Sequence, residues 1–296
     1  MKKKILLITG SSGFIGKLFL ADALKRGYQV IDILRDKNKK NYDLKKLKKL
    51  YPRSYKSVFY TKINTLESKL KSFKFECFIN FATLYNNSHL NIEIPRFIES
   101  NITFPSLILD TIFKKTKKII NFGTMMQHID GKNFTPINFY ASTKSAFEMI
   151  LKYFILQNKK LKFYNLKFYE SFHEKDHRNK LFPILYKNFK KNRTTQLVSK
   201  KLELNIIHVN DIIKAIHNIL TRNIPSGEYC LKNFKNIKIQ NFIDDVNRRS
   251  KRKIKVKFLN KKIPKIQRSY FKKLPKWIPD ITLRKKIINK FCNENN

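Results

Sequence analysis

Apolar residues in the first half of the chain occur in short continuous runs, and helical patterns separate one run from the next. The first run, residues 5–8, is continuously apolar, as expected of a strand buried on both faces of a parallel sheet. The pattern predicts strands at 5–8, 28–34, 57–60, 76–81, 118–122 and 161–168, with helices at 18–24, 43–50, 66–73, 95–115 and 140–157. We expect Pro105 to interrupt the helix at 95–115. This alternation predicts an α/β fold with a doubly wound parallel sheet and right-handed crossovers.

Glycines end the first predicted strand. Gly10, Gly13 and Gly16 recur at three-residue intervals in a chain that has only seven glycines. A strand, a glycine turn and a helix N-terminus direct backbone N–H groups and the helix dipole at an anion, and glycine lets a diphosphate approach closely. We therefore predict the dinucleotide-binding turn of a Rossmann domain. The residues expected to contact the cofactor here are Gly10, Ser12, Gly13, Phe14, Ile15 and Gly16.

The end of the second predicted strand indicates which dinucleotide binds. An acidic residue there holds the ribose 2′-hydroxyl of NAD, whereas an arginine suits the 2′-phosphate of NADP. The strand ends at Arg35, and Asp32 lies too early to be that acid. The chain continues with Lys37, Lys39 and Lys40. The sequence therefore favours NADP(H) as cofactor, with NAD(H) as the alternative.

Candidate catalytic residues follow the fifth predicted strand. Thr124 comes directly after it, and sixteen residues later Tyr140-Ala-Ser-Thr-Lys144 opens a long helix. Side chains at i and i+4 share one helix face, and a nearby cation lowers the pKa of a phenol, which makes it a usable general acid or base. The bare spacing occurs twice more in this lysine-rich chain. It is the order of the three residues along the fold that singles out Tyr140 and Lys144.

These motifs together resemble the extended short-chain dehydrogenase/reductase family of NAD(P)-dependent sugar-nucleotide epimerases and dehydratases. The stretches that carry the resemblance are Thr9-Gly10-x-x-Gly13-x-x-Gly16, Asn80-Phe81-Ala82, Glu99-Ser-Asn101-Ile, Thr124, Tyr140-x-x-x-Lys144, Asp176-His-Arg178-Asn-Lys180-Leu181 and Ile207-His208-Val209-Asn210-Asp211. The resemblance implies that Lys144 holds the nicotinamide ribose. It also implies that Tyr140 exchanges a proton with the sugar oxygen while hydride moves at the same carbon, and that Thr124 hydrogen-bonds that oxygen.

Further binding residues are expected around this centre. Phe81 and Ala82 end the fourth predicted strand, where ligands bind in open α/β sheets, so we expect both to contact the cofactor. Met125, Arg178 and Lys180 are expected to contact the substrate, the last two through its phosphates. A solvated basic loop is the other interpretation of Arg178 and Lys180.

The residues after Thr124 bear on the reaction. Family dehydratases carry an acidic pair there, whereas this chain has Met125-Met126-Gln127, so elimination of water is disfavoured. The stretch around Thr124 and the one from Tyr140 to Met149 most resemble CDP-linked 3,6-dideoxyhexose synthases, which reduce a 4-keto group. We therefore expect NADPH-dependent 4-keto reduction of a nucleotide-linked sugar in surface polysaccharide synthesis. An epimerase that retains NAD is the alternative.

The chain of 296 residues is long enough for one large or two small domains. We expect a Rossmann domain over 1–169 and mainly a substrate-binding lobe over 170–296, with some segments of the latter returning to the sheet. The tail from residue 251 is basic with interleaved aromatic residues, a composition that allows a segment that binds a membrane surface or nucleic acid. Because Pro264, Pro275 and Pro279 break any long amphipathic helix, we expect a peripheral segment of that lobe instead.

Cysteine and histidine usage predicts no metal site and no disulfide framework. The three cysteines, Cys77, Cys230 and Cys292, are far apart and odd in number, as expected of a cytoplasmic protein. His128 and His173 have no partners at metal-ligand spacing. No apolar stretch approaches the ~18 residues of a membrane span.

The net charge of +43, from 64 Lys and Arg against 21 Asp and Glu, has two interpretations. It favours anionic ligands, nucleic acid or an anionic membrane surface, or it reflects a biased genome that fills solvated faces with lysine. We expect a nucleotide-sugar substrate and no specific nucleic acid, and the resemblance allows a homodimer. A non-catalytic dinucleotide-sensing or nucleic-acid-binding relative is the alternative from another class. The intact Thr124, Tyr140 and Lys144 argue against it, because a binding module needs no tuned acid.

Overall fold

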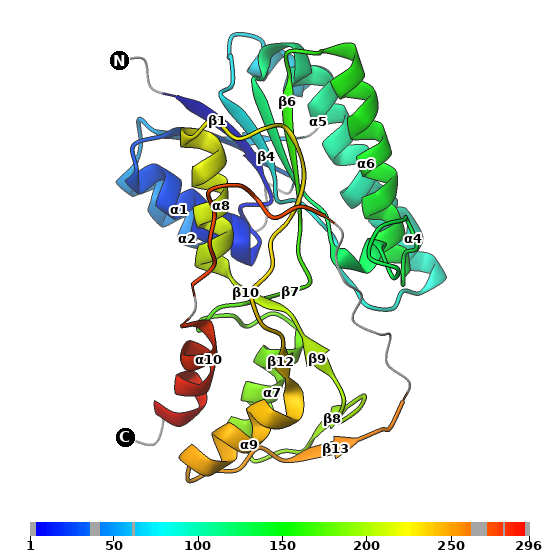
Figure 1. Ribbon diagram of the computed structural model, residues 1–296. Helices are drawn as coiled ribbons and strands as arrows, with labels where there is room; N and C mark the ends of the chain where they lie inside the picture. Colours follow the sequence, from blue (N-terminus) through cyan, green and yellow to red (C-terminus); the bar gives the residue numbers. More distant parts are fainter. Residues whose placement is uncertain (1–3, 36–41, 61–62, 262–270, 281, 294–296) are drawn as a thin grey trace. The chain divides into compact units, whose positions relative to one another are not determined.

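The computed structural model describes residues 4–35, 42–60, 63–261, 271–280 and 282–293 (Figure 1). The three lysines noted after Arg35 and the first proline of the tail, Pro264, lie outside these ranges. The chain folds into two compact units. The first comprises residues 1–128, 133–167 and 223–229, and the second comprises residues 129–132, 168–222 and 230–296.

A seven-stranded sheet forms the centre of the first unit. Its strands lie in the order β11 (Gly227–Cys230), β6 (Lys162–Lys167), β5 (Lys118–Phe122), β4 (Cys77–Asn80), β1 (Ile5–Thr9), β2 (Gln29–Leu34) and β3 (Tyr55–Phe59). Neighbours among β1 to β6 pair in parallel. The direction of winding reverses between β1 and β4, where Thr9 lies opposite Asn80, and sheets of this kind bind ligands at such a switch point. The predicted doubly wound Rossmann sheet is confirmed.

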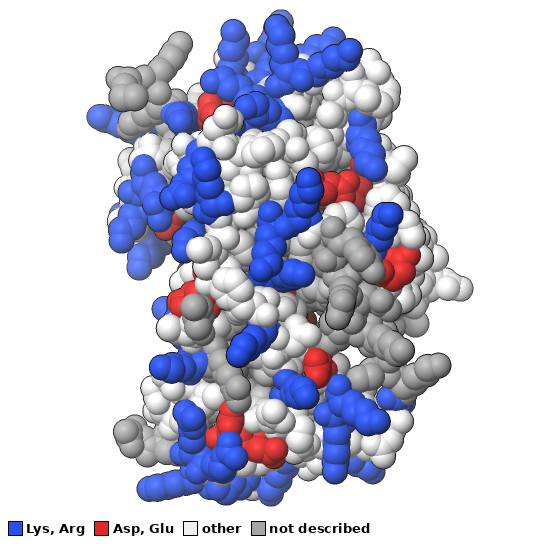
Figure 2. Space-filling model, in the orientation of Figure 1, with Lys and Arg blue, Asp and Glu red and all other residues white. Residues whose placement is uncertain are grey.

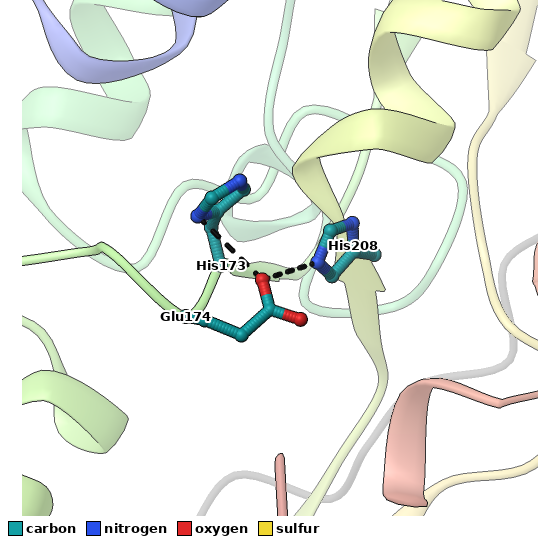
Figure 3. Close-up of side chains that lie close together, drawn as sticks. All are labelled: His173, Glu174 and His208. Atoms are coloured by element: carbon teal, nitrogen blue, oxygen red, sulfur yellow. Dashed lines mark hydrogen bonds and ion pairs between the residues drawn. The ribbon is translucent and has the colours of Figure 1, made fainter. Parts of the chain in front are cut away.

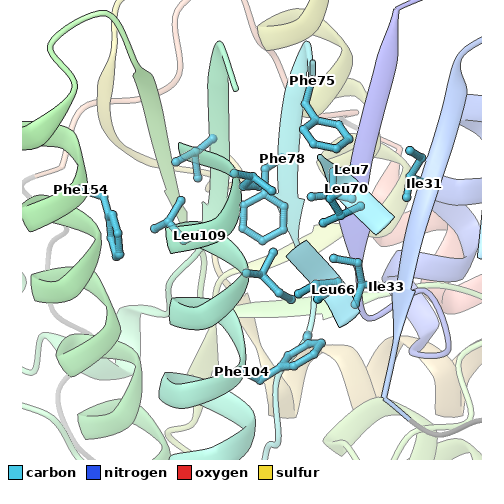
Figure 4. Close-up of a cluster of buried hydrophobic side chains, with 14 of the residues drawn as sticks. Leu7, Ile31, Ile33, Leu66, Leu70, Phe75, Phe78, Phe104, Leu109 and Phe154 are labelled. Atoms are coloured by element: carbon cyan, nitrogen blue, oxygen red, sulfur yellow. The ribbon is translucent and has the colours of Figure 1, made fainter. Parts of the chain in front are cut away.

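Helices cover both faces of this sheet (Figure 1). On one side lie α1 (Phe14–Lys25) and α2 (Tyr42–Leu50), and on the other lie α3 (Ile63–Leu70), α5 (Phe104–Ile112) and α6 (Phe139–Gln157). Alternate strand positions such as Ile31 and Ile33 face the second group, where they join a core that includes Phe78 and Phe104 (Figure 4). Each large apolar side chain buried there stabilises the fold by ~1.5–3 kcal/mol.

The helical segment between β4 and β5 differs from the prediction. A 3₁₀ turn (Asn91–Glu93), α4 (Ile94–Ile98), a π-helical turn (Glu99–Thr103), α5 and a second 3₁₀ turn (Phe113–Lys115) follow one another without a break. The regular α-helix is interrupted beside Pro105, as predicted, but the interruption is a π-helical turn that ends just before α5 and not a break in the chain of helical turns. The irregularity is the π-helical turn, which sequence periodicity does not reveal.

In the second unit, the described residues form three strand pairs and four helices. The strand pairs are β7 (Glu170–Phe172) with β10 (Ile206–His208), β9 (Glu203–Leu204) with β12 (Ile237–Lys238), and β8 (Thr195–Leu197) with β13 (Val256–Phe258). The helices are α7 (Leu181–Lys190), α8 (Val209–Thr221), α9 (Ile239–Arg249) and α10 (Leu283–Cys292). The expectation of a peripheral tail is wrong for α10, since Leu283, Ile287 and Phe291 are buried in the core of this unit. Prolines disrupt a helix that contains them, but α10 begins after Pro279.

Basic side chains are distributed over the face of the molecule in Figure 2, on both units, and few Asp and Glu lie among them. The total charge of +43 gives a field that attracts anionic ligands. Among the helices that the structure describes, none is both long enough and apolar enough to cross a membrane.

Candidate active site

The turn after β1 approaches the end of β4 so closely that there is no room for a side chain at Gly10. Gly10 has a φ of +74°, and a Cβ there would lie 2.5 Å from the backbone nitrogen of Ala82. A Cβ at Gly16 would collide with the Gly10 carbonyl oxygen. The Gly13 N–H donates to that same oxygen at 2.9 Å, which closes the turn. The glycine spacing is therefore required by the packing of the backbone.

A pocket of about 510 Å³ opens at this edge of the sheet. Its lining is Gly10, Ser12, Gly13, Ile33, Leu34, Arg35, Leu44, Phe81, Ala82, Thr83, Arg96 and Phe104, which brings together six of the residues predicted to hold the cofactor. Of the other five residues predicted to contact the cofactor, Phe14, Ile15 and Gly16 form the first turn of α1, and Tyr140 and Lys144 lie on α6. Among the residues that the structure describes, no side chain caps the N-terminus of α1, and its first turn contains no acidic residue. The positive end of its dipole therefore suits an anion.

Two arginines from different elements line the pocket. Arg35 follows β2 directly, and Arg96, which the sequence analysis missed, belongs to α4. Neither guanidinium forms a hydrogen bond or an ion pair with any residue that the structure describes. Burial lowers the pKa of Arg35, the Glu99 charge opposes this, and the Arg96 charge adds to it. Two neighbouring cations without a bound carboxylate fit a doubly charged anion such as a phosphate monoester.

Buried side chains tie the carboxyl ends of four strands together. Thr9 Oγ1 donates to Asn80 Oδ1 at 2.8 Å, and Asn80 Nδ2 donates to Asn121 Oδ1 at 3.2 Å. Asn121 Nδ2 continues the chain to Asn165 Oδ1 at 3.0 Å. These bonds cross from β1 through β4 and β5 to β6, and Thr9 Oγ1 also accepts the Ala82 N–H at 3.3 Å. These hydrogen bonds therefore fix the carboxyl ends of the four strands, beside the pocket, relative to one another.

Asp32, inside β2, is hydrogen-bonded to the glycine turn. Its carboxylate accepts hydrogen bonds from Ser11 Oγ at 2.5 Å and from the Tyr55 hydroxyl at 2.8 Å. Burial raises the pKa of Asp32 to about 6 against these two bonds. Asp32 is not among the residues that line the pocket, consistent with its position inside the strand.

Thr124 lies at the start of a 3₁₀ turn (Met125–Gln127) directly after β5. Its backbone N–H donates to Gln127 Oε1 at 2.7 Å. Gln127 Nε2 in turn donates to Ser145 Oγ on α6 at 3.2 Å. The turn that carries Thr124 is thus fastened to the helix that carries Tyr140 and Lys144.

The two predicted residues on α6 have different surroundings. Tyr140 is half-buried at the start of the helix, with its ring edge-on to Tyr85 at 4.9 Å between centroids. Lys144 is only 2% exposed, and its Nζ has no hydrogen-bond partner among the described residues. Burial lowers the pKa of Lys144 to about 8, and the Glu148 carboxylate one turn further along opposes this shift. A buried ammonium that no described residue accepts a hydrogen bond from fits the hydroxyl groups of a bound ribose.

The π-helical turn places Asn101 between two elements of the site. Asn101 Nδ2 donates to Thr143 Oγ1 on α6 at 2.9 Å and to the Leu84 carbonyl at 3.0 Å. Its Oδ1 accepts the Leu84 N–H at 2.7 Å. Asn101 thereby fastens the loop after β4 to α6, a role that its place in the motif did not reveal.

The predicted substrate residues do not form one group. Met125 is buried in the 3₁₀ turn beside Thr124. Arg178 and Lys180 belong to the second unit, where Arg178 pairs with Asp176 at 2.6 Å and Lys180 with Glu170 at 2.5 Å. Their charges are therefore matched by acids of their own unit, and substrate contact stays a prediction.

Two histidines and a glutamate, His173, His208 and Glu174, lie close together in the second unit (Figure 3). Glu174 Oε2 lies 3.0 Å from His208 Nε2 and 3.6 Å from His173 Nδ1. This proximity was not predicted, but each histidine already accepts a backbone N–H at Nδ1, from Lys175 and Asn210 respectively. Metal-bound histidines instead donate their second ring N–H. The arrangement fits a hydrogen-bonded cap of α8 better than a metal centre.

Comparison with known proteins agrees with this geometry. Residues 6–230 match the NAD dependent epimerase/dehydratase family. The CDP-abequose synthase of Yersinia pseudotuberculosis is 26% identical over 231 residues, which is 76% of this chain and 75% of that protein. The Salmonella muenchen CDP-abequose synthase is 22% identical and covers 77% of this chain and 74% of its own length. The structure of UDP-glucose 4-epimerase from Bifidobacterium longum in complex with NAD+ and UDP superposes with a TM-score of 0.78 at 18% identity, covering 98% of this chain and 97% of that one.

Proposed function

Because the chain belongs to the NAD-dependent epimerase/dehydratase family, we propose that it is an NADPH-dependent reductase of a nucleotide-linked 4-keto sugar. The observation that carries the proposal is the pair of arginines, Arg35 and Arg96, which line the predicted cofactor pocket and form no ion pair with any acidic residue in the described part of the chain. NADPH is consumed in reduction, whereas an epimerase keeps one oxidised cofactor. The distant similarity to CDP-abequose synthases favours the same reaction class.

The chain's own residues would divide the reaction as follows. A dinucleotide held by the glycine turn, Arg35 and Arg96 would make a hydride available for the carbonyl carbon. Tyr140 gives its phenolic proton to the carbonyl oxygen, and Thr124 Oγ1 hydrogen-bonds that oxygen. The Lys144 ammonium binds the ribose hydroxyls and favours the phenolate that remains on Tyr140. A solvent proton then restores the phenol.

Elimination of water is disfavoured by the turn after Thr124. A dehydratase needs an acid and a base beside the threonine, and here the next residues are Met125, Met126 and Gln127. The Gln127 amide is already bonded to the Thr124 N–H and to Ser145. No group in this turn can remove or deliver a proton, which supports reduction over dehydration.

The cofactor preference is tested by Arg96→Met. A hydrogen bond to a charged group contributes ~1.5–3 kcal/mol, so this variant is expected to bind NADPH about 10- to 100-fold more weakly than the wild type. Its affinity for NADH should be unchanged, because NADH lacks the 2′-phosphate. Isothermal titration of the purified protein with both cofactors measures this. Arg53→Met, at another exposed arginine of the same unit, is the matched control. Equal weakening for both cofactors would contradict the assignment.

The epimerase alternative differs in how the cofactor is held. A reductase must exchange its dinucleotide at every turnover, so protein purified without added cofactor should carry little of it and should take up NADPH reversibly. Denaturation followed by chromatography of the released nucleotides gives the answer. One equivalent of tightly held NAD per chain would favour the epimerase.

We also propose a homodimer formed through α6. Met149, Tyr153 and Leu156 are 55%, 57% and 74% exposed and recur at intervals of four and three residues, which places them on one face of the helix. An apolar stripe of this kind is typical of a helix packed against a partner. A second copy of the chain is the expected partner, since a two-fold axis can pair the stripe with itself.

The dimer proposal predicts that Leu156→Glu yields monomers. The substitution places a carboxylate within the apolar stripe, at its most exposed residue, so association should weaken by at least an order of magnitude. Size-exclusion chromatography with light scattering measures the mass, and Lys45→Glu on α2 is the control for a change of surface charge. A wild-type protein that is monomeric at micromolar concentration would rule the dimer out.

A further inference from the structure

A lysine that the sequence analysis placed only in a strand forms a buried charged cluster in the first unit. Lys167 ends β6 and is 0% exposed. Its Nζ lies 2.9 Å from Glu148 Oε2, 3.0 Å from Glu228 Oε2 and 2.8 Å from His128 Nε2. An ammonium has three N–H donors, so each of them has an acceptor. The acceptors come from α6, from β11 and from the segment after the 3₁₀ turn of Thr124.

The charge of each group in this cluster follows from the hydrogen bonds. His128 Nε2 accepts from Lys167, so its proton is on Nδ1, which donates to the Asn133 carbonyl at 2.8 Å. Burial lowers the pKa of His128, and the neighbouring Lys167 charge lowers it further. The histidine is therefore neutral, and one ammonium meets two carboxylates.

Glu148 connects this cluster to both sides of the candidate active site. It stands one helical turn after Lys144, and its charge is the one that opposes the lowering of the Lys144 pKa by burial. Its second oxygen, Oε1, is buried and has no hydrogen-bond partner among the described residues. That oxygen lies against Gly123, where a Cβ would be only 2.6 Å away, and Gly123 directly precedes Thr124.

His128 provides the second connection. It follows the 3₁₀ turn that begins at Thr124, and its backbone N–H donates to the Met125 carbonyl at 3.1 Å. Lys167 thus holds the far end of the turn through His128 and holds the carboxylate beside Lys144 through Glu148. Buried ion pairs contribute little net stability compared with apolar residues of the same volume, so stability alone is a weak reason for this cluster.

We propose that Lys167 is a positioning residue for the active site. Through Glu148 it keeps a carboxylate beside Lys144, so that Lys144 stays protonated, and through His128 it fixes the turn of Thr124. The part of the proposal that concerns Lys144 rests on the proposed function in one respect. It assumes that Lys144 binds the ribose on the nicotinamide side of the cofactor. The charged and titratable groups around the shared carboxylate are Lys144 on its own helix, Lys167 on β6, Glu228 on β11 and His128.

The test is Glu148→Gln, which keeps the shape of the side chain and an acceptor for Lys167 but removes the charge. Two probes are titrated calorimetrically into the protein between pH 6 and pH 9: NADPH, and adenosine 2′,5′-bisphosphate, which lacks the nicotinamide half. NADPH affinity at pH 8 should fall about tenfold, while affinity for the bisphosphate stays within twofold. In the wild type, NADPH affinity declines as the pH rises through the Lys144 pKa of about 8. In the variant this decline should begin at lower pH, because the charge that stabilised the ammonium is gone.

Two further variants keep the proposal falsifiable. Lys167→Met should reproduce the loss for NADPH alone, and if it fails to fold, Glu148→Gln still decides. Glu76→Gln is the matched control, since Glu76 pairs with Lys117 at 3.0 Å and with Lys118 at 3.8 Å. Glu76 directly precedes β4 and therefore lies at the amino ends of the strands, away from the candidate site at their carboxyl ends. Equal weakening for both probes in Glu148→Gln, or no change in NADPH affinity and its pH dependence, would overturn the proposal. None of these titrations needs a sugar substrate, so a failure of the proposed reductase activity would be recognised separately.

Discussion

Tyr140→Phe is expected to lower turnover of a nucleotide-linked 4-keto sugar by about 10³-fold or more, because it removes the proton that the carbonyl oxygen must receive. NADPH affinity should change less than twofold, since the ring and its edge-on contact with Tyr85 remain. Stopped assays at 340 nm give the rate, and calorimetric titration gives the affinity. Tyr85→Phe, which removes a neighbouring hydroxyl from the same aromatic pair, is the control and should keep most of the wild-type rate.

The pH dependence provides a second view of the same centre. Burial lowers the pKa of Lys144 to about 8, so the ammonium is present below that pH and is lost above it. The kcat/KM for NADPH should therefore fall as the pH rises through about 8.

A Tyr140→Phe variant that retains a near-normal rate would show that another group supplies the proton.

Gly10→Ala is expected to abolish NADPH binding in the calorimeter and to lower the melting temperature. The alanine Cβ would lie 2.5 Å from the backbone at Phe81 and Ala82, so the turn must move away from the end of β4 and open the pocket. Both contacts are with backbone atoms, which cannot rotate aside as a flexible side chain could.

Gly27→Ala separates this effect from backbone strain. Gly27 also has a positive φ, of +82°, but a Cβ there meets nothing within 4 Å. The left-handed conformation alone costs an alanine roughly 1–2 kcal/mol. Gly27→Ala should therefore lower the melting temperature modestly and leave NADPH affinity unchanged. Unimpaired NADPH binding in Gly10→Ala would show that the pocket at this turn does not hold the cofactor.

Sequence patterns predict the sheet well because its strands are buried on both faces. Residues 118–122 are predicted and observed as β5, and the other predicted strands of the Rossmann sheet differ from the observed ones by at most two residues at either end. The π-helical turn at Glu99–Thr103 is not predictable from periodicity, since it inserts one residue into an otherwise regular apolar pattern. The burial of α10 is also missed, because its high lysine content hides a short apolar face.

The candidate site is predictable only where a motif fixes the backbone. The glycine turn is of this kind, since its spacing follows from a close approach of β1 to β4. Arg96 and Lys167 are missed because each acts across the fold, on Arg35 and on Glu148 respectively, and a chain with 64 Lys and Arg gives no reason to select them. The signal for Lys167 was its position, a charge inside a strand that must be buried on both faces.

The most direct test of the account is deuterium transfer from NADPH labelled at the hydride position. The protein is mixed with the labelled cofactor and a CDP-linked 4-keto-3,6-dideoxy sugar, and the product is analysed by mass spectrometry and NMR. We predict one deuterium at C4 of the product sugar and one NADP+ formed per sugar reduced. A sugar recovered with its 4-keto group intact and without deuterium, together with NADPH that is not oxidised, would contradict the proposed reduction.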